Sequence, residues 1–238
     1  MGTTYPYKAA TIKALTADEA ELTKINAYTL KEMSAEEVFV FKVIACSNEV
    51  DRDQEAFTAH ALHQLSELYK GKTMILNHEN RTENQVARIY DTELAEDKAK
   101  ITALGESYTT LVLHVFLPRI EKNADLIAEI EAGIKKEVSV GCRCINKTCS
   151  VCGAEARGYQ HLNCGHTVGQ AYDGKTCAVR LDDVTDAYEV SFVAVPAQRD
   201  AGTTKATETE PKVSSAPPSG GQSAEKSILD GFLKYLKQ

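Results

Sequence analysis

The chain has 238 residues, of which 43% are hydrophobic and 26% are charged. These values are ordinary for globular proteins and exclude a wholly disordered or collagen-like chain. The 27 lysines and arginines against 34 aspartates and glutamates give a formal net charge of −7, which argues against a protein that wraps nucleic acid with its whole surface.

The composition changes along the chain and suggests four parts. Residues 1–36 are mixed and weakly periodic, which predicts an arm with short helical pieces, and 37–200 form the main domain. Residues 201–222 hold few apolar side chains, so we expect a flexible linker there. Residues 223–238 carry an apolar stripe at helical spacing, which predicts a terminal amphipathic helix.

Strand-like segments dominate the main domain. They are rich in β-branched and aromatic residues and cover 38–44, 74–76, 86–90, 100–104, 111–117, 138–140, 178–181 and 188–195. Two helices are expected, one beginning after Thr58 and ending before Gly71, the other beginning after Asn123. The strands outnumber the helices and do not alternate with them, so we predict an α+β fold, a mainly antiparallel sheet or barrel with a few packed helices.

The seven cysteines are clustered, with five of them between Cys142 and Cys164. Clustered cysteines in a chain without secretory features indicate metal binding rather than disulfides. Cys149 and Cys152 form a CxxC pair, and eleven residues separate Cys152 from a second pair, Cys164 and His166. This spacing is typical of zinc sites.

We therefore predict a small zinc-knuckle insert at about 145–177. The segment has few apolar residues, so metal binding would supply the free energy that folds it. Four protein ligands leave no open position, which makes the zinc structural. His161 and Cys177 are alternatives for one of the last two ligands; the favoured set is Cys149, Cys152, Cys164 and His166.

Three polar residues lie at the edges of apolar strands: His78, Ser139 and Glu189. A serine hydroxyl becomes a nucleophile when a base lies within hydrogen-bond reach, and the base needs a third group to orient it. Gly141 would let main-chain donors approach an oxyanion. The residue types fit a proton relay, whereas the spacing alone does not show that they meet.

Several segments resemble the tailed-phage prohead (capsid maturation) proteases. Residues 137–141 (EVSVG) and 188–197 (YEVSFVAVPA) resemble the paired signature of that family, and 76–78 (LNH) resembles its histidine motif. Residues 51–55 and 118–136 also fit the family, as its early segment and the segment before its serine strand. The resemblance covers roughly residues 38–202.

The resemblance implies a fold similar to the herpesvirus assembly proteases, a closed β-barrel wrapped by helices, and the activity of a serine endopeptidase. Ser139 would be the nucleophile, His78 the general base and Glu189 the acidic third member. Herpesvirus-type enzymes use a second histidine instead, so His114 is an alternative to Glu189. Ser191 alternates in phase with Glu189 and fits a structural serine. A cysteine-rich insert occurs in some phage members.

The resemblance also implies a biological setting. The enzyme would cleave the major capsid protein, the scaffold segment and itself during procapsid maturation, inside assembling proheads in the host bacterial cytoplasm. Portal or shell proteins and a second copy of the chain are further candidate partners. No apolar run approaches the ~20 residues that cross a bilayer, so no membrane partner is expected. The alternative, which rests on the cysteines, is a non-enzymatic zinc-stabilised adaptor for virion assembly or nucleic acid.

Overall fold

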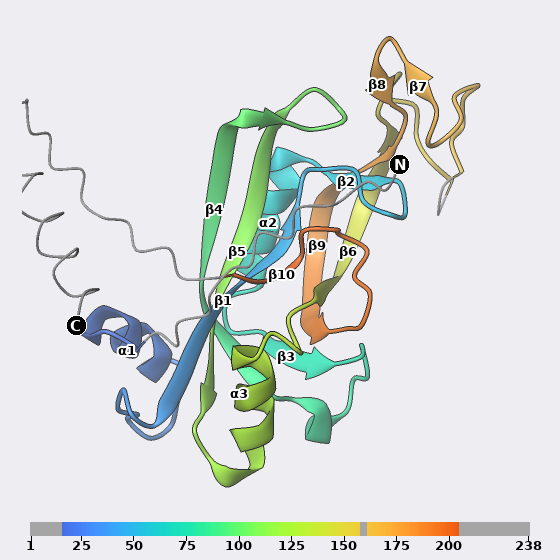
Figure 1. Ribbon diagram of the computed structural model, residues 1–238. Helices are drawn as coiled ribbons and strands as arrows, with labels where there is room; N and C mark the ends of the chain where they lie inside the picture. The colour runs from blue at the N-terminus through green and yellow to red at the C-terminus, as the bar shows by residue number, and fades with distance from the viewer. Residues whose placement is uncertain (1–15, 158–160, 205–238) are drawn as a thin grey trace, which may run out of the picture. The chain divides into compact units, whose positions relative to one another are not determined.

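The computed structural model describes residues 16–157 and 161–204, which belong to one compact unit, Met1–Ala206 (Figure 1). The predicted terminal helix and all but the first residues of the predicted linker lie outside the described residues.

Strands predominate over helices, as the sequence pattern predicts. The strands are β1 (Val38–Ser47), β2 (Glu55–Phe57), β3 (Thr73–Leu76), β4 (Ala87–Ile101), β5 (Ser107–Pro118), β6 (Val138–Cys149), β7 (Ala171–Tyr172), β8 (Lys175–Thr176), β9 (Val179–Phe192) and β10 (Gly202–Thr204). The helices are α1 (Glu19–Asn26), α2 (Ala59–Leu68) and α3 (Ala124–Glu131), with short 3-10 turns at Thr82–Asn84 and Glu121–Asn123. The α+β class is confirmed.

The main sheet is open and mixed, so the prediction of a closed antiparallel barrel is wrong. Its strand order is β10-β1-β5-β4-β3-β9-β2, and β6 pairs with β9 off this path. β2 and β3 both run parallel to β9, while β6 runs antiparallel to it. Within the described residues, the β-pairing between the β6 side of the sheet and β10 is limited to an isolated bridge between Glu137 and Gly202. A cavity lined by Ala45 of β1 and by several β6 residues occupies the space where a barrel would need a ladder.

β9 is one continuous strand, where the sequence pattern suggests two short ones. Polar side chains in the middle of β9 contact α2. Asp182 Oδ1 accepts a hydrogen bond from Thr58 Oγ1 at 2.8 Å and lies 2.9 Å from His60 Nδ1. Both partners belong to the start of α2. The polar residues therefore attach α2 to the sheet without ending the strand, so β9 runs without a break from the end of the cysteine-rich segment to Glu189.

The helices pack on the sheet through apolar faces. Thr58 caps α2 as predicted, because its side chain accepts a hydrogen bond from Ala61 N, and Gly71 follows the helix with φ +79°. Asn123 precedes α3, but its side chain donates to Pro118 O instead of capping. No helix in the described part of the chain is long and apolar enough to span a membrane.

α1 lies within the predicted N-terminal arm and is joined to the sheet by a small core of its own. A capping box of Asp18 and Glu21 starts the helix. Ile25 on its inner face is fully buried. The cluster around it consists of Ala17, Val38, Val40, Tyr90 and Phe116.

Replacing Ile25 with alanine should therefore destabilise the protein. Removing a fully buried isoleucine side chain costs about 2–5 kcal/mol, because the lost contacts and the cavity add up. Leu30→Ala is the matched control, since Leu30 is fully exposed and surface changes stay within about 0.5 kcal/mol. Denaturant unfolding of the full chain measures both. Equal effects of the two substitutions would show that α1 does not pack as described.

Candidate active site and metal centre

A tight turn at the end of β3 positions His78. Asn77 and His78 both have positive φ, 53° and 56°, and Glu79 N donates to Leu76 O at 3.1 Å across the turn. Two central residues with positive φ are the mark of a type I′ turn, and asparagine and histidine tolerate this backbone better than most residues. The His78 amide also donates to Ser191 Oγ at 3.0 Å, which ties the turn to β9.

The His78 ring is hydrogen-bonded to Glu189. His78 Nδ1 lies 2.8 Å from Glu189 Oε1. An ionised carboxylate only accepts, so Nδ1 carries the proton of this hydrogen bond, and in the neutral imidazole the lone pair is then on Nε2. The His78 side chain is 44% exposed, whereas that of Glu189 is 5% exposed. The pair therefore has a buried acid behind a histidine that solvent or a substrate can reach, the arrangement of an oriented general base.

Ser191 holds the other oxygen of this carboxylate. Its hydroxyl donates to Glu189 Oε2 at 2.5 Å. A buried carboxylate is costly unless its oxygens are hydrogen-bonded, and here both oxygens have a donor. Ser191 is fully buried, so it serves as a positioning residue that a substrate does not reach. Its alternation in phase with Glu189 is the sequence signal for this role.

Ser139 lies on β6, directly opposite Ser191 in the antiparallel ladder. Residues directly opposite share a face of the sheet, with Cβ atoms about 4.5–5.5 Å apart, and Glu189 is on that same face two residues earlier on β9. The structure thus brings Ser139, Glu189 and the His78 ring to one side of the β6–β9 pair. The described hydrogen bonds of Ser139 and His78 do not include one between them, and such contacts are often loose before substrate binds.

Gly141 is required by the Glu189 carboxylate. It pairs with Glu189 across the ladder, and a Cβ atom added there would lie closer than 3.0 Å to Oε1. The Gly141 carbonyl accepts a hydrogen bond from the buried Tyr69 hydroxyl at 3.2 Å, which fixes the backbone from the other direction. The absence of a side chain is what lets the acid reach the histidine.

Gly141→Ala should displace the Glu189 carboxylate and destabilise the protein by about 1–3 kcal/mol, the usual cost of overpacking. The carboxylate cannot move aside without breaking its bonds to His78 and Ser191. Denaturant unfolding and the NMR signal of the His78 Nδ1 proton measure the two effects. Gly133→Ala is the control, because a Cβ there meets nothing within 4 Å, although its φ of +72° adds some strain. An unchanged His78 signal in Gly141→Ala would contradict the described packing.

His114, the alternative third member, has other neighbours. It lies on β5 with its side chain 14% exposed, edge-on to Tyr90 and with Nε2 3.5 Å from Glu93 Oε2. Burial, reinforced by the positive charge of Lys42, lowers the pKa of His114 below its ordinary value. The residue that the structure places against His78 is Glu189 and not His114.

The cysteine-rich insert joins β6 to β9 and gathers the four predicted ligands. One ligand atom from each of Cys149, Cys152, Cys164 and His166 lies within 4.8 Å of the others. His166 Nδ1 is 3.7 Å from Cys149 Sγ and 3.5 Å from Cys164 Sγ. Zinc bonds of about 2.0–2.3 Å in a tetrahedron place ligand atoms about 3.5–3.8 Å apart, so the group could hold a metal ion.

The two alternative ligands lie outside this group. His161 is exposed. Cys177 is fully buried, with its Sγ 3.9 Å from Cys149 Sγ, but it is not among the four residues whose ligand atoms all lie within 4.8 Å of one another. The Val151 amide points at Cys149 Sγ at 3.4 Å, a donor of the kind that favours a thiolate.

Purified protein should therefore contain about one equivalent of metal, and chelation should lower its thermal stability because ligation contributes folding free energy. Cys152→Ser and His166→Ala should each reduce the bound metal, measured by elemental analysis. Cys177→Ser is the matched control and should retain it. A loss with Cys177→Ser equal to that with Cys152→Ser would show that the ligand set is wrong.

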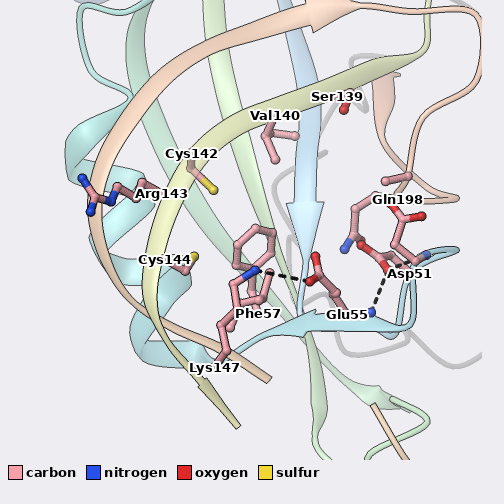
Figure 2. Close-up of a pocket in the computed structure, with 14 residues that line it drawn as sticks. Asp51, Glu55, Phe57, Ser139, Val140, Cys142, Arg143, Cys144, Lys147 and Gln198 are labelled. Atoms are coloured by element: carbon pink, nitrogen blue, oxygen red, sulfur yellow. Dashed lines mark hydrogen bonds and ion pairs between the residues drawn. The ribbon is translucent and has the colours of Figure 1, made fainter. Parts of the chain in front are cut away.

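A cavity of about 430 Å³ opens beside Ser139, between β6, the end of β1 and the segments 51–57 and 197–198 (Figure 2). Burial raises the pKa of Asp51 to about 6, even though its Oδ1 accepts hydrogen bonds from the amides of Asp53 and Glu55, both at 2.9 Å. Glu55 Oε1 lies 3.5 Å from Lys147 Nζ, an ion pair without a hydrogen bond. The sequence pattern does not predict this cavity, because residues 51–55 taken alone favour a solvated turn, with contact to a substrate as the lesser alternative.

Comparison with known proteins adds no family to this geometry: no family model matches the chain, and no curated protein or solved structure matches it either.

Proposed function

We propose that the chain is a serine endopeptidase in which Ser139 is the nucleophile, His78 the general base and Glu189 the acid that orients the base. The observation that carries this proposal is the 2.8 Å hydrogen bond between His78 Nδ1 and Glu189 Oε1, on the face of the β6–β9 pair that also holds Ser139. The bond leaves Nε2 free to take a proton, as a general base requires.

The reaction would run in two stages. His78 Nε2 takes the proton of Ser139 Oγ as that oxygen attacks the scissile carbonyl, and Glu189 stabilises the imidazolium that forms. Backbone amides near Ser139 hold the oxyanion, and His78 then gives its proton to the leaving amine. Water, activated by the same histidine, releases the acyl group from Ser139.

The resemblance of 76–78, 137–141 and 188–197 to the prohead proteases supports a substrate class: the major capsid protein and scaffold segments of a tailed phage, and the chain itself. It also supports a place of action inside assembling proheads in the host bacterial cytoplasm, and a fold related to the herpesvirus assembly proteases despite the open sheet.

The metal centre has a structural role in this proposal. The three thiolates and one imidazole fit zinc, which would supply folding free energy to the insert; Cys149, Cys152, Cys164 and His166 would hold it. The group lies at the opposite end of the β6–β9 ladder from Ser139, so the chemistry at the serine needs no metal ligand.

Ser139→Ala should abolish cleavage of co-expressed capsid protein and of the chain's own 201–222 segment. Glu189→Gln should lower the cleavage rate by about 10⁴-fold, because one of the two oxygens that accept from His78 and Ser191 becomes an NH₂ donor, which leaves one partner without an acceptor or turns the histidine to the wrong tautomer. Gel analysis and mass spectrometry of the products measure both effects.

Ser107→Ala is the matched control, since the structure gives this hydroxyl no part in the site, and it should cleave normally. Cleavage that persists in Ser139→Ala would exclude Ser139 as the nucleophile. A wild-type chain that binds capsid protein without cleaving it would instead favour the non-enzymatic adaptor.

A further inference from the structure

The cavity beside Ser139 combines apolar walls with carboxylates. Ala45, Phe57, Val140 and Leu181 supply apolar surface, and Asp51, Asp53 and Glu55 supply the acids. In Figure 2, Asp51, Glu55 and Gln198 lie on one side of the cavity, while Cys142 and Cys144 lie on the other. A long side chain with an apolar stem and a cationic end matches such a lining.

The charges of the lining favour a cation. Two basic residues border the cavity, but Figure 2 shows the Arg143 side chain pointing away from it. Lys147 is paired with Glu55 at 3.5 Å. This ion pair is long, and the same buried oxygen, Glu55 Oε1, accepts no hydrogen bond. A donor that enters the cavity could provide one.

A second buried polar atom of the lining also lacks a partner, and this one needs an acceptor. Gln198 is 7% exposed, and its Nε2 has no hydrogen-bond partner, while its Oε1 accepts from Ser47 Oγ at 2.9 Å. A buried donor left unsatisfied costs about 1–3 kcal/mol, so an incoming acceptor such as a peptide carbonyl is favoured here. The wall is held in place, because Arg52 donates to Pro196 O through its side chain and to Ala197 O through its amide.

The geometry points to this cavity as the pocket that selects the residue before the cut bond, and to lysine or arginine as that residue. The inference rests on the proposed function. Ser139 borders the same cavity, so a side chain inserted there lies next to Ser139. The volume of about 430 Å³ lies in the range of preformed binding pockets and accommodates one such side chain.

The first test measures cleavage. The full chain is incubated with a mixture of random peptides, and the products are sequenced by mass spectrometry. Cleavage after lysine or arginine should exceed cleavage after norleucine by about tenfold, equivalent to about 1.4 kcal/mol. Glu55→Gln should remove most of this preference, and Lys147→Gln, which deletes the internal competitor, should increase it. Glu96→Gln, a half-exposed carboxylate on β4 outside the cavity, is the matched control and should leave the preference unchanged.

The second test does not depend on cleavage. The Ser139→Ala chain is titrated with N-acetyl-lysine amide and with N-acetyl-norleucine amide, and backbone NMR shifts are followed. The lysine compound should shift the amides of 51–57 and 197–198, and Glu55→Gln should weaken its binding by about tenfold.

The outcomes separate the two claims. Lysine binding without any Ser139-dependent cleavage would support the pocket and overturn the proposed enzyme. Ser139-dependent cleavage without a preference for lysine or arginine would overturn only the claim that the cavity selects a basic residue. A preference for glutamine, which is polar but uncharged, would have the same consequence. Equal binding of the lysine and norleucine compounds, or binding of neither, would also overturn it.

Discussion

The pairing of β6 with β9 determines the rest of the site. In that ladder Ser139 faces Ser191 and Gly141 faces Glu189. The lack of a side chain at Gly141 makes room for the Glu189 carboxylate. That carboxylate is hydrogen-bonded to Ser191 on its own strand and to His78 in the turn after β3. β3 in turn is aligned by its parallel register with the same end of β9. The positions of the His78 turn, Glu189 and Ser139 thus all depend on β9.

Because Glu189 is buried, the hydrogen-bonded group of His78, Glu189 and Ser191 is sensitive to substitution. Glu189 is 4% exposed, and the free energy lost by removing a carboxylate from water is offset when each of its oxygens meets a donor. Here one donor is a buried hydroxyl and the other is a histidine that reaches solvent. Loss of either donor would leave a buried carboxylate oxygen unsatisfied, so the residues around it have little freedom to vary.

Local patterns in the sequence predicted much of this structure. The strand content, the Thr58 cap and the four-residue metal group follow from spacing and residue type, because each depends on a few neighbouring positions. The closure of the sheet could not be predicted, since it depends on whether β6 meets β1 or leaves a cavity, a long-range choice that strand patterns do not encode. The meeting of His78 with Glu189 was expected only from a resemblance; residues 111 positions apart carry no local signal of contact.

The position of the metal group has a consequence for how the chain folds. β6 and β9 are the two arms of a hairpin whose long loop begins after Cys149, and Ser139 lies ten positions back along β6, about 33 Å at 3.3 Å per residue. Metal ligation would close that loop, so less conformational entropy would be lost when β6 pairs with β9. A slip of one residue would turn Ser139 and Glu189 to opposite sides of the sheet. A metal ion at the far end of the ladder would thus help to keep Ser139 and Glu189 on one face of the sheet, although no metal ligand contacts either residue.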